Sequence, residues 1–195
     1  MCYMYKNYTF PLYIFVVFEK SNSKMWSSSV LKPNNYLLLL DNKWFYSLNL
    51  FFRNDLFLSN SYLAETFAID SLKFTKFNDL LNNFFSKHRI VLFYSYYFFN
   101  IKVKLHVVLL VNFFLKERVD SVDKIYKNSS WLEREVSEMS GINYSFKKDV
   151  RKLLLDYSKN ENPLLKDFPV EGFSEIFYDF FEDQTIFLDS NVVEL

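Results

Sequence analysis

Few residues of this 195-residue sequence have the types and the spacing that a catalytic or metal site requires. Glu135 and Glu138 are one helical turn apart, a spacing at which two carboxylates can work as an acid/base pair or hold a cation. Carboxylates on a helix surface are far more often solvated, and we expect that here. His88 and His106 have no cysteine or carboxylate at ligand spacing, so we expect no metal site at either residue.

The cysteine and glycine content excludes several cofactor-binding motifs. Cys2 is the only cysteine, which excludes an intrachain disulfide and a cysteine-rich iron–sulfur or zinc site. Gly141 and Gly172 are the only glycines, so the chain has no glycine-rich phosphate loop. We find no nucleophile–base pair of the kind that a stand-alone hydrolase needs. We therefore expect that this chain binds no cofactor and that any redox centre belongs to another chain.

Apolar side chains are abundant: half of the residues are hydrophobic, 21% are aromatic, and 24 are Phe. Two explanations stay open. One is a partner surface, because a domain of this size does not comfortably hide so much apolar bulk. The other is codon bias in a small AT-rich genome, such as that of an organelle.

The sequence has no segment typical of membrane insertion or import. The longest apolar stretches, residues 10–18, 90–99 and 107–115, are shorter than the ~20 residues that span a bilayer, so we predict no transmembrane helix. No arginine precedes Arg53, unlike an arginine-rich import sequence. If the protein works in mitochondria, we therefore expect it to be made inside them.

The net charge is zero overall but unevenly distributed. Residues 171–195 contain seven acids and no Lys or Arg, so all 23 basic residues precede them. The acidic segment is either a solvated, disordered tail or one that lies on a basic protein surface. Aromatic residues such as Phe177, Phe180 and Phe187 favour the second interpretation, because a solvated tail has no use for them.

Alternation and helical spacing locate elements in the middle of the chain. Residues 62–69 alternate and predict a strand, and Asp70 is a plausible cap for an amphipathic helix over residues 72–86. Residues 89–99 and 101–112 are rich in β-branched and aromatic residues and predict an antiparallel hairpin. Residues 36–52 are apolar on several sides, so helix and strand both stay open for them.

The C-terminal half contains signals that start and end helices. Ser130 lies three residues before Glu133, which is the pattern of a capping box, and Gly141 suits the left-handed end of a helix. The sequence thus predicts a helix from about residue 130 to Gly141. It also predicts a shorter helical run over residues 150–155 and an extended path after Pro163.

The most informative stretch is residues 120–179, in which charged residues, prolines and both glycines follow one another in a specific order: Trp131, Glu133, Arg134, Glu135, Gly141, Arg151, Asp156, Tyr157, Pro163, Lys166, Asp167, Phe168, Pro169 and Gly172. This order and spacing resembles the signature of the 30-kDa (NuoC-type) hydrophilic subunit of respiratory complex I. Both glycines of this glycine-poor chain fall on glycine positions of that family. The sequence departs from the family pattern at Ser140, Lys147, Lys148, Asn162 and Leu165.

The resemblance implies an α+β fold, with a mixed, largely antiparallel sheet, helices packed on one side, and an extended C-terminal tail. It divides the chain into a divergent segment over residues 1–60, a core over 61–157, and an acidic-aromatic tail over 158–195 that docks on a partner. We expect the signature residues to be structural. Arg134 should pair with a carboxylate, which its planar guanidinium suits.

The implied function is that of a non-catalytic structural subunit in the quinone-reducing peripheral arm of NADH:ubiquinone oxidoreductase. The expected partners are the 49-kDa-type quinone-site subunit and neighbouring iron–sulfur subunits, with flavin and clusters in other chains and membrane contact only through the complex. The expected location is the matrix-facing arm at the mitochondrial inner membrane. The alternative is an organellar ribosomal or other RNA-binding protein. That class needs clustered Lys and Arg, which a neutral chain with an acidic end does not favour, so we expect no nucleic acid partner.

Overall fold

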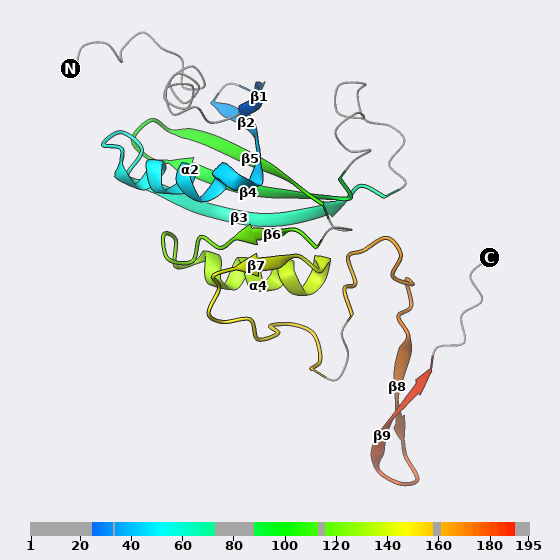
Figure 1. The fold of residues 1–195 in the computed structure, drawn as a ribbon. Helices are drawn as coiled ribbons and strands as arrows, with labels where there is room; N and C mark the ends of the chain where they lie inside the picture. The colour runs from blue at the N-terminus through cyan, green and yellow to red at the C-terminus, as the bar shows by residue number, and fades with distance from the viewer. Residues whose placement is uncertain (1–24, 33, 73–87, 113–115, 158–160, 190–195) are drawn as a thin grey trace, which may run out of the picture.

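The computed structural model describes residues 25–32, 34–72, 88–112, 116–157 and 161–189 (Figure 1). Its centre is a five-stranded sheet in the order β1-β2-β5-β4-β3. The pair β2–β5 is parallel and the other neighbouring strands are antiparallel. The sheet is therefore mixed and largely antiparallel, as predicted. Its strands are β1 (Met25–Lys32), β2 (Asn35–Leu40), β3 (Ser61–Asp70), β4 (Ile90–Phe98) and β5 (Val103–Val111).

The strands β3, β4 and β5 confirm the predicted strand over residues 62–69 and the predicted hairpin. The β4–β5 register runs from Ile90 opposite Val111 to Phe98 opposite Val103. Both strands are buried over most of their length, at positions that face either side of the sheet. This explains why β-branched and aromatic residues dominate them.

Residues 36–52, for which helix and strand were both open, contain one of each. The strand β2 ends at Leu40, and the helix α2 (Asn42–Asn54) follows at once. Its buried residues Phe45, Leu48, Asn49 and Phe52 recur at helical spacing and form one stripe facing the sheet. The strands β1 and β2 therefore share a sheet with the residues after 60, and residues 38–52 share a core with them, although they precede the expected boundary at residue 60.

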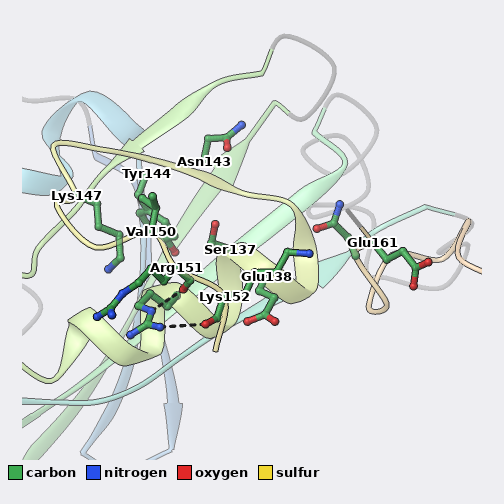
Figure 2. A pocket seen from close by; sticks show the side chains of 11 residues that line it. Ser137, Glu138, Asn143, Tyr144, Lys147, Val150, Arg151, Lys152 and Glu161 are labelled. Atoms are coloured by element: carbon green, nitrogen blue, oxygen red, sulfur yellow. Dashed lines mark hydrogen bonds between the residues drawn. The ribbon is translucent and has the colours of Figure 1, made fainter. Parts of the chain in front are cut away.

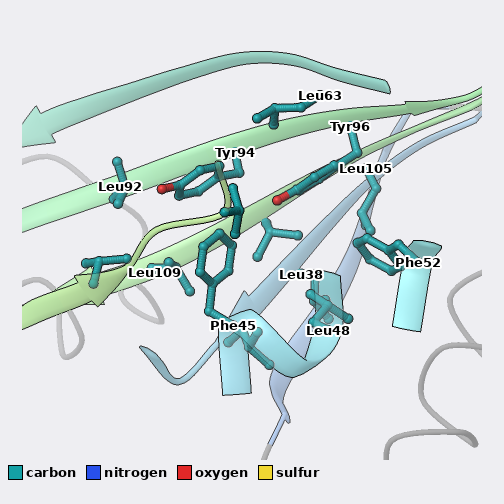
Figure 3. Packing of buried hydrophobic residues seen from close by; sticks show 14 of the residues in the cluster. Leu38, Phe45, Leu48, Phe52, Leu63, Leu92, Tyr94, Tyr96, Leu105 and Leu109 are labelled. Carbon is teal, nitrogen blue, oxygen red and sulfur yellow. The ribbon is translucent and has the colours of Figure 1, made fainter. Parts of the chain in front are cut away.

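The main core lies between one face of the sheet and the two described helices. Tyr94 and Tyr96 of β4 pack against Phe45 and Phe52 of α2 (Figure 3), with ring centroids 4.4 Å apart for Phe45–Tyr94 and 5.4 Å for Phe52–Tyr96. Val136 of the second helix belongs to the same cluster. This arrangement, with both described helices packed on one side of the sheet, confirms the predicted α+β class.

A short parallel pair lies beside the main sheet. It consists of β6 (Arg118–Asp120) and β7 (Asn143–Ser145), and the helix α4 (Ser129–Ser140) connects them. The helix α4 packs against β3 and ends at Gly141, whose φ of 70° is left-handed. Glycine adopts this conformation without the steric penalty of a Cβ, so the predicted helix end is confirmed.

The C-terminal part consists of two extended strands that pair with each other. They are β8 (Ser174–Asp179) and β9 (Gln184–Asp189), and they form an antiparallel hairpin that protrudes from the body of the protein (Figure 1). The sequence predicted the extended path but not this pairing. The predicted helical run over residues 150–155 is wrong, because those residues form bends and loops.

Some expectations concern residues outside the described part of the chain. The predicted amphipathic helix over residues 72–86 falls almost entirely there, as does the apolar stretch 10–18. Among the described residues, no helix has the length and apolar character needed to cross a membrane.

Replacing Asn49 with alanine tests how far the core depends on one buried amide. Asn49 Oδ1 accepts a 2.6 Å hydrogen bond from the Tyr96 hydroxyl, and its Nδ2 donates to the Phe45 carbonyl at 2.8 Å. We expect Asn49→Ala to lower the free energy of unfolding by about 1–3 kcal/mol, because the Tyr96 hydroxyl stays buried without its acceptor. The measurement is urea unfolding of Asn49→Ala, Tyr96→Phe and the double variant. The double variant should lose less than the two single losses together; strictly additive losses would contradict the coupling.

Candidate assembly interface

The helix α4 positions the charged residues of the signature. Ser129, Glu133, Val136 and Ser140 are buried and recur at helical spacing, so they form the inward stripe of the helix. Glu133 therefore points into the protein and not back along the helix. The first turn has Asn128 as its N-cap, with no side-chain capping bond. The predicted capping box of Ser130 and Glu133 is thus wrong.

Glu133 has no exposed surface, and its carboxylate binds donors from separate segments of the chain. It accepts hydrogen bonds from the Ser121 hydroxyl at 2.6 Å and the Val122 backbone N–H at 2.9 Å. Lys147 Nζ, also buried, completes the set at 2.9 Å. Burial raises the pKa of Glu133, and the bonds from Ser121, Val122 and Lys147 only partly oppose this. The carboxylate thus ties the loop after β6 and the loop after β7 to α4.

Lys147, which stands at a departure from the family pattern, has further contacts that hold it in place. Its Nζ donates to the Ser130 carbonyl at 3.1 Å and lies 5.7 Å from the centre of the Tyr144 ring. A buried ammonium needs several partners of this kind to offset its lost hydration. Sequence reasoning missed Lys147, because its partner Glu133 is on the helix before it and nothing local marks the pair.

Arg134 is hydrogen-bonded to the loop that follows β7. Its Nε donates to the Arg151 carbonyl at 2.8 Å and its Nη2 to the Lys152 carbonyl at 3.2 Å. Its Nη1 lies 3.4 Å from Asp149 Oδ2, so the expected pairing with a carboxylate is present. The two backbone carbonyls are the closer partners. Asp149 also pairs with the exposed Arg151 at 2.8 Å, and this side-chain bond holds the pKa of Asp149 well below its usual range.

Glu138 holds the same loop at its far end. Its carboxylate accepts the backbone N–H groups of Leu153 at 2.7 Å, Leu154 at 3.1 Å and Leu155. Burial raises the pKa of Glu138, but these three donors outweigh it and leave the pKa below its ordinary value. Because the three N–H groups point at one carboxylate, they are not available to a helix, which is why residues 150–155 form none.

These contacts give Glu135 and Glu138 different roles. Glu138 is buried and its oxygens accept backbone donors, so the expectation that it is solvated is wrong, whereas Glu135 is exposed as expected. Figure 2 shows Glu138 and Arg151 at the cleft of about 280 Å³ between α4 and the loop, where Lys147 and Lys152 also project. Among the described residues, no three His, Cys, Asp or Glu side chains gather as metal ligands.

A second ion cluster attaches the start of the C-terminal part to the sheet. Asp70, at the end of β3, is paired with Arg89 at 2.9 Å, and both side chains are nearly inaccessible to solvent. Arg89 also pairs with Asp167, and the Lys166 backbone N–H donates to Asp70 Oδ2 at 3.0 Å. Burial raises the pKa of Asp70, but the bonds from Arg89, Lys166 and Leu72 keep it below the ordinary value.

The sequence singled out Asp70 as a helix cap but did not identify Arg89. The sequence predicted both strands but not their pairing. In the observed β3–β4 register Asp70 lies opposite Ile90, which brings Arg89 beside it.

The neighbouring signature residues hold the same segment in place. Leu164 donates its N–H to the Met139 carbonyl at 3.0 Å, and Leu165 packs on the main core. Phe168 and Phe173 meet edge to face with centroids 5.1 Å apart. Between them Gly172 closes a turn onto Pro169 with φ of 75°, which explains its glycine. Residues 163–173 thus form an ordered connection rather than a loose one.

Beyond these attachments the chain exposes apolar side chains. Near α4 and its loop, Trp131 is 62% exposed and Tyr157 is 68% exposed. Asp156 is exposed as well and accepts the Lys152 ammonium at its carbonyl. In the hairpin, Ile176 lies opposite Phe187, and the next pair, Phe177 opposite Ile186, points to the other face. Both faces of the hairpin therefore carry uncovered apolar side chains.

Lys147→Met tests whether the buried carboxylate organises α4 and its loops. We expect a loss of about 3–5 kcal/mol in the free energy of unfolding, because Glu133 keeps its buried charge without a counter-ion. Since burial raises the pKa of Glu133 in the folded state, stability tied to that group is present at low pH and lost as the pH rises. The loss should thus be smaller in mildly acidic than in mildly alkaline buffer. The exposed neighbour gives a control, Lys148→Met, which should change stability by no more than about 0.5 kcal/mol. Equal losses in both variants would refute the role of Glu133.

The two ion pairs of Arg89, with Asp70 and with Asp167, should contribute unequally to the free energy of unfolding. Arg89→Met should lower the free energy of unfolding by about 3–5 kcal/mol, because Asp70 is left buried without its counter-ion. Asp167→Asn should cost less than about 1 kcal/mol, since that side chain is 54% exposed. The pKa of Asp70 is depressed in the folded state, so the difference between wild type and Arg89→Met should shrink as the pH falls below the ordinary value of 3.8. Thermal unfolding over a pH series measures both effects, and a larger loss in Asp167→Asn would overturn the ranking.

Comparison with known proteins places this geometry in a family. Residues 41–174 match the family described as "Respiratory-chain NADH dehydrogenase, 30 Kd subunit". NADH-ubiquinone oxidoreductase subunit 9 of Paramecium primaurelia is 39% identical over 189 residues, which cover 95% of this chain and 87% of the relative. The subunit 9 of Paramecium tetraurelia is 36% identical over the same shares of both chains. A bacterial relative, an NADH-quinone oxidoreductase subunit of Rickettsia typhi, is 33% identical over 110 residues, 56% of each chain.

A solved structure shares the fold. It belongs to the membrane-bound sulfane sulfur reductase, an archaeal respiratory membrane complex, and matches with a TM-score of 0.62 and 16% identity over 82% of this chain and 85% of the other. At that identity the likeness concerns the fold alone. The sequence matches confirm the resemblance seen in the signature, and they do not support an RNA-binding protein. The chain belongs to the family of 30-kDa subunits of the respiratory-chain NADH dehydrogenase.

Proposed function

We propose that this chain is a structural subunit that holds neighbouring subunits of the quinone-reducing peripheral arm together and takes no part in the chemistry. The observation that carries the proposal is the β8–β9 hairpin. A lone two-stranded hairpin is marginally stable in water, and this one has apolar side chains on both faces. Such an element gains its stability from the surface on which it lies.

The signature residues support this role by separating into two groups. The inward side chains of Glu133, Arg134 and Glu138 are engaged with other segments of this chain, so they fix the loop and are not free to act as an acid or a base. The side chains of Trp131 and Tyr157 are exposed, which makes them available to a partner. We infer that the signature builds a docking surface, and that this chain binds no cofactor of its own.

The partner chemistry follows from the charge of the tail. Glu175, Asp179, Glu182, Asp183 and Asp189 surround the apolar side chains of the hairpin, and no Lys or Arg occurs after residue 170. The complementary surface is apolar with a basic rim. We propose the 49-kDa-type quinone-site subunit as this partner, with iron–sulfur subunits adjoining, on the matrix side of the mitochondrial inner membrane. The relatives named as NADH-ubiquinone oxidoreductase subunit 9 support membership of this complex.

The division of the chain is proposed accordingly. Residues 164–167 bond to Met139, Asp70 and Arg89, so they belong to the body of the protein in the described structure. The docking element proper begins near Phe173, later than the position 158 expected from the sequence. A cut after Asp156 would remove body contacts along with the tail, so an informative truncation leaves them in place.

Deleting residues 174–189 should separate assembly from folding. The isolated truncated chain should keep its free energy of unfolding within about 1 kcal/mol, because most side chains of the hairpin are exposed. It should fail to enter the NADH dehydrogenase complex, since each buried aromatic side chain contributes roughly 1.5–3 kcal/mol before ordering costs. Native gel electrophoresis with mass spectrometry of the complex measures incorporation.

Point substitutions refine this test. Phe177→Ser with Phe187→Ser should reduce incorporation as the deletion does. The matched control, Leu56→Ser with Phe99→Ser, changes apolar side chains that are 89% and 51% exposed elsewhere on the body, and should assemble normally. A truncated chain that unfolds would make the hairpin part of the core. One that assembles fully would make it dispensable.

A further inference from the structure

A basic groove lies at the end of β3 opposite to the Asp70 cluster. It has a volume of about 630 Å³ and is bounded by the last turn of α2, the first residues of β3 and the loop that precedes α4. Figure 1 shows that these segments meet at the end of the sheet away from the C-terminal hairpin. The groove is therefore separate from the C-terminal hairpin.

The lining of the groove carries positive charge only. Arg53, Lys124 and Lys127 all line it and are exposed, whereas no Asp or Glu does. Within the described residues none of the three forms an ion pair, and Arg53 donates only to the Ser59 carbonyl at 3.3 Å. Three cations around one hollow raise its positive potential and attract anions.

The two acids nearest in sequence, Asp55 and Asp123, are not part of the lining. Asp55 accepts the backbone N–H groups of Phe57 at 2.8 Å and Leu58 at 3.3 Å, which directs its carboxylate into the α2–β3 loop. Asp123 is adjacent to Lys124, but it is not part of the lining.

Apolar surface lies between the three cations, and hydrogen bonds hold the segments below it in place. Leu50 is 40% exposed and Tyr62 is 49% exposed, and both line the groove. Beneath them the Tyr126 hydroxyl and Ser61 hydroxyl are hydrogen-bonded at 2.7 Å and buried. Asn128 Nδ2 donates to the Leu63 carbonyl at 2.6 Å, which fastens the loop before α4 to β3. The groove is thus preformed, so a ligand does not have to order it.

We propose that this groove binds an acidic peptide segment of a neighbouring protein subunit, with at least one apolar side chain of that segment on Leu50 and Tyr62. The charge of the lining selects carboxylates, and the apolar patch between the cations selects a peptide over a compact anion. The chain then engages one neighbour through an acidic hairpin and another through a basic groove.

The test is to place a photo-activatable benzophenone side chain at Tyr62 of the full chain, in the assembled complex, and identify the cross-linked peptide by mass spectrometry. The expected product is a protein segment of net negative charge. Lys124→Glu with Lys127→Glu should reduce its yield by about tenfold or more, because like charges now face each other. The matched control is Lys43→Glu with Lys104→Glu, which changes the net charge equally at exposed lysines outside the groove, and should leave the yield within about twofold.

A second measurement covers the case in which the charge-reversed chain does not assemble. The isolated full chain is titrated with a fluorescent synthetic peptide of Asp, Glu and Phe and with a peptide in which Lys replaces the acids. Binding of the acidic peptide alone, weakened by salt and by Lys124→Gln with Lys127→Gln, supports the groove. Cross-linking to a basic or neutral segment, to RNA or to lipid, absence of any cross-link, or equal binding of both peptides would overturn the proposal.

Discussion

Glu133 carries its carboxylate into the interior of the protein, and the arrangement of the whole signature region follows from the need to compensate it. A buried charge is tolerated only when donors surround it. Here they come from the loop after β6 and, as Lys147, from the loop after β7. The loop after β7 is in turn held by Arg134 and Glu138 through backbone groups. One helix thus fixes a loop that has no regular secondary structure to hold it.

The consequence for function is that some side chains hold loops of this chain in place, while others face outward and are available to a partner. Glu133, Arg134 and Glu138 of α4 turn toward the chain itself, whereas Trp131 and the apolar residues of the loop face outward. The cluster of Asp70 and Arg89 does the same for the tail, because it anchors residues 166–167 and lets the hairpin project beyond them. A subunit of this kind can expose a large apolar area and still keep a well-defined shape.

The acidic and the basic surfaces of the protein lie apart from each other. The hairpin brings carboxylates and aromatic side chains to one end of the molecule, and the groove of Arg53, Lys124 and Lys127 lies at the other end of β3. Complementary charge favours the correct neighbour and penalises the wrong one. A small chain with opposite charges at its two ends is suited to join two different subunits, which agrees with a structural role in a large complex.

The sequence by itself determined the elements whose signals are local and repeated. The alternation in residues 101–112 predicted β5, Gly141 predicted the end of α4, and the spacing of residues 131–172 identified the family. Only the tertiary structure decided what Glu133, Glu138 and Arg89 do. The four-residue pattern of Ser130 and Glu133 predicted a capping box. In the folded chain the Glu133 carboxylate instead accepts hydrogen bonds from donors 11 and 12 residues away, which the core holds beside it. Residues 150–155 have helical spacing, but a carboxylate from α4 took their N–H groups. A local sequence pattern indicates the secondary structure that a segment favours by itself. A buried charge, in contrast, can bond to any donor that the folded chain brings close to it.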